Sequence, residues 1–121
     1  MKSIFVAGSR KFYEDVEKIV ELCKQNGIKV ETAGKSQSTE DTLESESSAL
    51  FRAFERIENA DILYVSSKNG YIGKTVAMEI SYAFSKNKEI ISSEKIEDFS
   101  VQALVSKIME TEELVKYATS D

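Results

Sequence analysis

The sequence predicts a three-layer α/β/α domain in which a sheet of four to five parallel strands carries helices on both faces. Short apolar runs, typical of buried strands, alternate along the chain with longer segments whose apolar residues recur at helical spacing. Turns that contain glycine, at 8–10 and 66–73, follow two of these runs and lead toward helical segments. Because strand–helix–strand units of this kind form right-handed crossovers, we expect ligands at the carboxyl edge of the sheet.

Length and composition indicate one globular unit. The chain has 121 residues, and we expect a single domain over 1–121 with a frayed tail over 115–121. Hydrophobic residues make up 41% and charged residues 31%, a balance typical of globular proteins. No apolar run approaches the ~20 residues of a membrane span, and the run in MKSIFVAG is too short for a signal peptide. These features predict a cytoplasmic protein without membrane contacts.

Charge and residue usage exclude several classes of function. A formal net charge of −5 argues against nucleic-acid polymers as partners, because these are bound by basic surfaces. The chain has no histidine and one cysteine, Cys23, which lies in a helical pattern and is expected in the core. We therefore expect neither a metal site nor a cofactor. Acid or base chemistry then falls to carboxylates, tyrosines, lysines or the substrate itself.

The amino-terminal third reads as strand, helix and strand. A buried strand over 3–7 is followed by the turn Gly8-Ser9-Arg10 and by a helix that begins near Phe12 or Tyr13 and ends at Asn26-Gly27. The turn is either an anion site, supplied by unpaired N–H groups, the Ser9 hydroxyl and the Arg10 charge, or an ordinary connection. An alternating segment over 28–33 predicts an outer strand.

The remaining elements continue the alternation. The polar stretch 34–42 either covers a site or is simply solvated, and a second helix is expected from near Asp41, capped by Glu44, to Asn59. Its predicted apolar stripe consists of Leu43, Leu50, Phe54 and Ile57. Strands over 61–65 and 89–91 flank a third helix that ends at Asn87-Lys88, and a last amphipathic helix is expected over Val101, Leu104, Val105 and Ile108. This order is typical of a flavodoxin- or Rossmann-like sheet.

Glu79 is the most informative position of the third helix. At about 100° per residue, Val76, Ile80, Ala83 and Phe84 share one arc that should face the core. Glu79 lies about 60° from Val76 and about 40° from Ala83, on the border of that arc. A carboxylate placed there is either held in a cleft with a raised pKa or reaches water or Lys86.

The tripeptide Gly73-Lys74-Thr75 resembles the end of a phosphate-binding P-loop. That motif requires a glycine five residues before Gly73, and position 68 is lysine. The sequence therefore does not predict a P-loop NTPase, because the tight turn that cradles the phosphates is missing.

The segment GYIGKTVAMEISYAFSKNKEI resembles the glycine loop and glutamate helix of the nucleoside 2-deoxyribosyltransferase-like superfamily. Glu79-Ile80-Ser81-Tyr82-Ala83 stands where the family has the pattern E-[IL]-G-x-A, and Asn87-Lys88 stands where the family has G-K before a strand. The opening IFVAGSR is similar to the first strand and turn of the related deoxynucleoside 5′-monophosphate N-glycosidases.

The resemblance implies a role for each matched residue. Glu79 would be the nucleophile that attacks the anomeric carbon of a 2-deoxyribosyl group, and water or a second base would resolve the covalent intermediate. Ser9, Gly70 and Gly73 would suit a 5′-phosphate or a ribose hydroxyl, and Tyr71 would stack on the base or lie on the surface as an ordinary aromatic. The other expected substrate-binding residues are Gly8, Arg10, Ser66 and Asn69.

Two positions depart from the family pattern. The family has a second carboxylate eight residues before the aspartate that opens the third strand, and this chain has Ala53 there. Asp61 would lie about 15 Å from the carboxyl edge at ~3.3 Å per residue and is expected to be a strand-start residue. Glu46, two turns earlier on the same helix, is a weak substitute. Ser81 replaces the usual glycine.

The sequence thus leaves three functions open. The first is nucleoside or nucleotide binding with N-glycosidic bond cleavage or deoxyribosyl transfer through Glu79. The second is a catalytically inactive nucleotide-binding or sensing domain, as Ala53 suggests, and the third is a structural or antitoxin-like partner. The resemblance further implies a homodimer or higher homo-oligomer.

Overall fold

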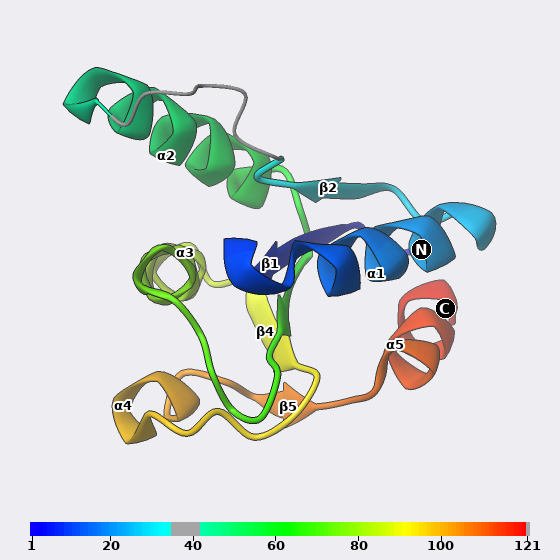
Figure 1. The fold of residues 1–121 in the computed structure, drawn as a ribbon. Helices are drawn as coiled ribbons and strands as arrows, with labels where there is room; N and C mark the ends of the chain where they lie inside the picture. Colours follow the sequence, from blue (N-terminus) through cyan, green and yellow to red (C-terminus); the bar gives the residue numbers. More distant parts are fainter. Residues whose placement is uncertain (35–41, 121) are drawn as a thin grey trace.

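The computed structural model describes residues 1–34 and 42–120 and confirms the three-layer α/β/α architecture (Figure 1). Within these residues a parallel five-stranded sheet has the order β2-β1-β3-β4-β5, the order of flavodoxin-like folds. The strands are β1 (Ile4–Gly8), β2 (Val30–Thr32), β3 (Ile62–Ser66), β4 (Glu89–Ser92) and β5 (Lys107–Ile108). The alternating segment expected to be an outer strand is indeed the edge strand β2.

Helices cover both faces of the sheet (Figure 1). They are the single 3₁₀ turn η1 (Arg10–Phe12), α1 (Tyr13–Gln25), α2 (Leu43–Glu58), α3 (Lys74–Ser85), α4 (Phe99–Gln102) and α5 (Thr111–Thr119). Core residues of α1 and α5 pack on one face, and those of α2 and α3 pack on the other. Cys23 is buried in the first of these clusters, as expected, and burial raises the pKa of its thiol to about 11.

Three expectations about the helices are wrong in detail. The capping pair of α2 is Thr42 and Ser45, whose side chains and backbone N–H groups bond reciprocally; Asp41, predicted as the start, lies outside the described residues, and Glu44 is not the capping partner. Leu43 is 93% exposed because it stands on the first turn of α2, before the helix reaches the core. Phe84 of α3 is 55% exposed and does not share the buried arc.

The carboxyl-terminal region differs from the single helix predicted over 101–108. The chain instead forms α4, then β5, and then α5. Backbone bonds at both ends of β5, Ser106 N to Ile90 O at 2.9 Å and Met109 N to Ser92 O at 2.9 Å, fix this strand on β4. The expected frayed tail is also wrong up to residue 119, because Ala118 is buried and its carbonyl accepts a bond from Lys2 N.

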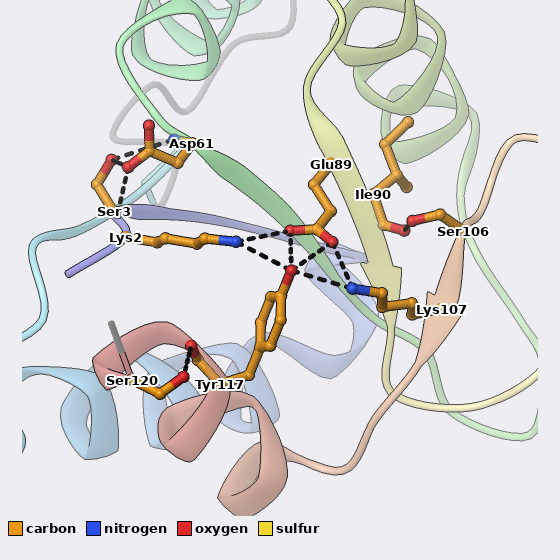
Figure 2. Close-up of polar contacts among 9 residues, drawn as sticks. All are labelled: Lys2, Ser3, Asp61, Glu89, Ile90, Ser106, Lys107, Tyr117 and Ser120. Atoms are coloured by element: carbon orange, nitrogen blue, oxygen red, sulfur yellow. Dashed lines mark hydrogen bonds and ion pairs between the residues drawn. The ribbon is translucent and has the colours of Figure 1, made fainter.

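At the amino edge of the sheet, polar side chains connect the ends of several strands (Figure 2). Glu89 accepts hydrogen bonds from Lys107 Nζ at 2.9 Å and from Tyr117 Oη at 2.7 Å, and it lies 3.6 Å from Lys2 Nζ. Asp61 accepts a bond from Ser3 N at 2.8 Å just before β3, as expected of a strand-start residue. These contacts tie β1, β3, β4, β5 and α5 together.

Among residues 1–34 and 42–120, none of the helices combines the length and the apolar character that a membrane crossing requires.

Candidate functional site

A cavity of about 560 Å³ opens at the carboxyl edge of the sheet. Its floor is the end of β1 with the turn that follows, and its walls are the end of β2, the amino-terminal half of α2 and the first turns of α3. The polar and charged residues of its lining are Ser9, Arg10, Tyr13, Thr32, Ser45, Glu46, Ser48, Arg52, Lys74, Thr75 and Glu79. The cavity lies where ligands of open parallel sheets bind.

Close packing of β1 on α1 depends on Gly8. A Cβ atom at Gly8 would lie 2.4 Å from Val16 Cγ2 and 3.3 Å from Ser66 Cβ, so a side chain there would force α1 and β3 away. The next residue, Ser9, lies beside the start of α3. Its hydroxyl oxygen accepts a bond from Lys11 N at 3.2 Å and lies 3.8 Å from the position of a Cβ at Gly73. The first and third strand–helix connections therefore meet at the cavity.

Glu79 of α3 lines this cavity and is 2% exposed. Its Oε2 atom is buried and has no hydrogen-bond partner in the part of the chain that the structure describes. Burial raises the pKa of this carboxyl group to about 7, because water no longer stabilises the charged form. The alternative of a pair with Lys86 is wrong, since Lys86 Nζ lies 3.2 Å from Glu58 Oε1.

Glu46 provides a second carboxyl group in the lining. Its Oε2 atom lies 3.7 Å from Arg10 Nη2, so the two side chains form an ion pair between α2 and the turn after β1. Ala53, two turns further along α2, also lines the cavity and is buried. The site therefore places a methyl group where the resemblance leads one to expect a carboxylate.

Five of the predicted site residues meet at this cavity: Gly8, Ser9, Arg10, Gly73 and Glu79. Ser66, Asn69, Gly70 and Tyr71 are not part of its lining.

The glycine loop is used for packing. Asn69 and Gly70 have φ angles of 56° and 80°, and the N–H of Gly70 donates to Glu94 Oε1 at 2.8 Å. A Cβ at Gly70 would lie 3.1 Å from Glu97 N. Tyr71 packs edge-on against Phe12, with ring centroids 6.0 Å apart. The positive φ values and the close approach account for asparagine and glycine at these two positions of the loop.

Several lining residues were not predicted from the sequence. They are Tyr13, Ser45, Ser48, Arg52, Lys74 and Thr75. The four residues Ser45, Ser48, Ala49 and Arg52 recur three or four positions apart on the face of α2 that also carries Ala53, and this small and polar stripe is the signal that could have identified them. No group of three or more potential metal-ligating Cys, Asp or Glu side chains occurs within 1–34 and 42–120.

Comparison with known proteins agrees with this geometry. No protein-family model and no curated protein sequence matches the chain. Among solved structures, the 2-deoxyribosyltransferase from the psychrotolerant bacterium Bacillus psychrosaccharolyticus superposes with a TM-score of 0.74 at 16% identity, over 98% of this chain and 92% of that chain. This chain has the fold of a 2-deoxyribosyltransferase.

Two further structures show the same fold. The CMP N-glycosidase from Clostridium botulinum matches with a TM-score of 0.61 at 14% identity, over 96% of both chains. The 2-deoxyribosyltransferase from Leishmania mexicana matches with a TM-score of 0.60 at 15% identity, over 97% of this chain and 95% of that chain. The resemblance seen in the residues around Glu79 thus extends over nearly the whole chain at the level of the fold.

Proposed function

We propose that this protein binds a nucleoside or nucleotide in the cavity at the carboxyl edge and cleaves its N-glycosidic bond, or transfers the deoxyribosyl group to a second base. The observation that carries the proposal is the Glu79 carboxyl group, buried in the lining with an unpaired oxygen. Such an oxygen has no structural partner to lose when a sugar carbon approaches. The superposable 2-deoxyribosyltransferases and the CMP N-glycosidase support the substrate class.

Glu79 would act as the nucleophile. Its ionised oxygen attacks the anomeric carbon, the bond from that carbon to the base breaks, and a glycosyl ester forms. Water or a second base then displaces the ester and returns the carboxylate. Gly8, Ser9, Arg10 and Gly73 lie in the same lining and would hold the sugar or a 5′-phosphate.

The test is release of free base. The protein is incubated with deoxynucleosides and with deoxynucleoside monophosphates, with and without an acceptor base, and products are separated by chromatography. We expect base release or exchange, and we expect its loss in the Glu79→Ala variant while binding is retained. Equal turnover by the Glu79→Ala variant would show that the nucleophile lies elsewhere.

Ala53 favours a second candidate function, a catalytically inactive nucleotide-binding or sensing domain. In that case the methyl group in the lining marks the loss of an acid that the reaction needs. Nucleotide binding measured by calorimetry, without any base release over long incubation, would support this function and exclude the first.

We also propose that the protein forms a homodimer or a higher homo-oligomer. Large apolar side chains are exposed on the outer side of α2 and α3, namely Leu43, Phe51 and Met78. Pairing of two copies would remove such side chains from water. Light scattering on the purified protein distinguishes a 13.6-kDa monomer from a dimer directly.

A further inference from the structure

The two carboxyl groups of the cavity are in different electrostatic situations. Glu46 already has a cation, because Arg10 lies 3.7 Å away. Glu79 Oε2 is buried and has no partner among the described residues. A ligand that places a positive charge beside Glu79 therefore gains an attraction that a neutral ligand of the same shape does not, since the low dielectric of a buried site strengthens a charge pair.

Besides Glu46, the described lining carries three cationic side chains. Arg10, Arg52 and Lys74 all contribute to it, from the β1 turn, α2 and the start of α3. These cations suit a phosphate group. The lining as a whole therefore suits a molecule that carries both a positive charge for Glu79 and a phosphate group.

We propose, on the basis of the function proposed above, that the preferred substrates are nucleotides whose base is joined to the sugar through a positively charged ring nitrogen, as in N-glycosylpyridinium nucleotides. The charged nitrogen is bonded to the anomeric carbon that Glu79 would attack. A single carboxylate thus pairs with the cation of the substrate and is positioned for the reaction at the neighbouring atom.

The reaction of this class balances without an acid at the leaving group. Glu79 Oε2 forms a bond to the anomeric carbon, the carbon–nitrogen bond breaks, and its electron pair neutralises the ring, which leaves as a neutral pyridine. Water then attacks the anomeric carbon, the carboxylate leaves, and one proton of the water passes to the solvent. A neutral base, by contrast, leaves poorly unless a general acid protonates it.

The absence of a general acid at the second carboxyl position of the described lining agrees with a substrate whose leaving group needs no protonation. Ala53 offers a methyl group, and Glu46, the other carboxyl group within the described lining, is paired with Arg10. The described lining therefore fits a substrate that needs no protonation better than one that does.

The test compares nicotinamide mononucleotide with its reduced form, which has the same sugar, phosphate and ring atoms but no ring charge. We expect the protein to release nicotinamide from the oxidised form, and to bind that form at least tenfold more tightly than the reduced form in calorimetry. The Glu79→Gln variant should lose both the release and the preference between the two forms. Glu55→Gln, the same change on an exposed position of α2 outside the cavity, should keep both.

The outcomes separate this inference from the proposed function. Cleavage of deoxynucleoside monophosphates without any release of nicotinamide would overturn the inference and leave the proposed function intact. Equal binding of the oxidised and reduced forms would also overturn it, because Glu79 would then not recognise the charge. Absence of base release from every nucleoside and nucleotide tested would overturn both.

Discussion

Glu79 and Glu89 are ten residues apart in the sequence and stand at opposite edges of the sheet in opposite electrostatic states. Glu79 lies at the carboxyl edge, is 2% exposed and has an unpaired oxygen. Glu89 lies at the amino edge and is bound by Lys107 and Tyr117, with Lys2 nearby (Figure 2). Glu79 thus keeps an oxygen without a partner among the described residues, whereas Glu89 is hydrogen-bonded to its neighbours.

The pKa values of the two groups move in opposite directions. Burial raises the pKa of Glu79 to about 7. Burial also acts to raise the pKa of Glu89, but hydrogen bonds from Lys107 and Tyr117 outweigh it and hold that pKa below its usual value. The comparison teaches that the amino edge is built for stability, whereas the carboxyl edge keeps an energetically costly group, which is the pattern expected of a functional site.

The largest expected effect is on catalysis and separates the two glutamates. Glu79→Gln should reduce base release by roughly a thousand-fold or more, because an amide oxygen cannot form the glycosyl ester. Glu89→Gln changes a carboxylate of the same size at the other edge and should leave the rate constant of the folded enzyme unchanged. The measurement is single-turnover base release by both variants at a temperature where each is folded. Similar losses of base release in the two variants would show that the two glutamates do not differ in their effect on catalysis.

The second effect is on stability and depends on pH. The raised pKa of Glu79 means that the folded state binds the proton more tightly than the unfolded state, so the contribution of Glu79 to stability is greatest below about pH 4.5 and declines as pH rises to about 7. Glu79→Gln removes this decline. The variant should therefore gain about 3 kcal/mol relative to the wild type between pH 4.5 and pH 8.

Urea unfolding of both proteins at pH 5 and at pH 8 measures this gain. The contributions of the other ionisable groups to the pH dependence of stability cancel, because both proteins contain these groups. A constant difference between them across the pH range would show that Glu79 is solvated.

Much of the architecture could be predicted from the sequence because it depends on local patterns. The apolar arc of α3 placed Val76, Ile80 and Ala83 in the core and Glu79 at its border, and the structure confirms these placements. The turn Gly8-Ser9-Arg10 was correctly placed at the carboxyl edge, since a strand followed by a helix leaves its connection there.

Features that depend on contacts between distant segments could not be predicted. Val101, Leu104, Val105 and Ile108 have helical spacing, yet Lys107 and Ile108 form β5, whose pairing with β4 is not visible in a local pattern. Similarly, Gly70 suggested a ligand loop, whereas its positive φ and its contacts with 94–97 serve the packing of the chain itself. Glycine marks a conformational need without showing whether chain or ligand imposes it.

The third prediction concerns how the carboxyl edge is packed. Gly8→Ala places a methyl group 2.4 Å from Val16 Cγ2, and we expect a loss of about 1–3 kcal/mol of unfolding free energy from overpacking. The double variant Gly8→Ala, Val16→Ala provides the control, because the smaller side chain makes room for the methyl group. Urea unfolding should show that the double variant is more stable than the sum of the two single changes predicts. Additive losses would show that Val16 is not what Gly8 accommodates.

The smallest expected effect concerns Glu89, the carboxylate that Lys107 and Tyr117 bind. Tyr117→Phe removes the hydroxyl group that donates to Glu89 and accepts from Lys2 Nζ and Lys107 Nζ, at 2.9 and 3.0 Å. We expect a loss of about 1 kcal/mol at pH 7, the typical net value of one intramolecular hydrogen bond. Because the pKa of Glu89 is lowered in the folded state, the stabilisation that its ionised form supplies is present above about pH 4.5 and is lost as pH falls. The stability of Tyr117→Phe relative to the wild type should therefore rise as pH falls, whereas the stability of Glu79→Gln relative to the wild type should fall. Parallel pH profiles of these two relative stabilities would contradict the assignment of opposite roles to the two edges.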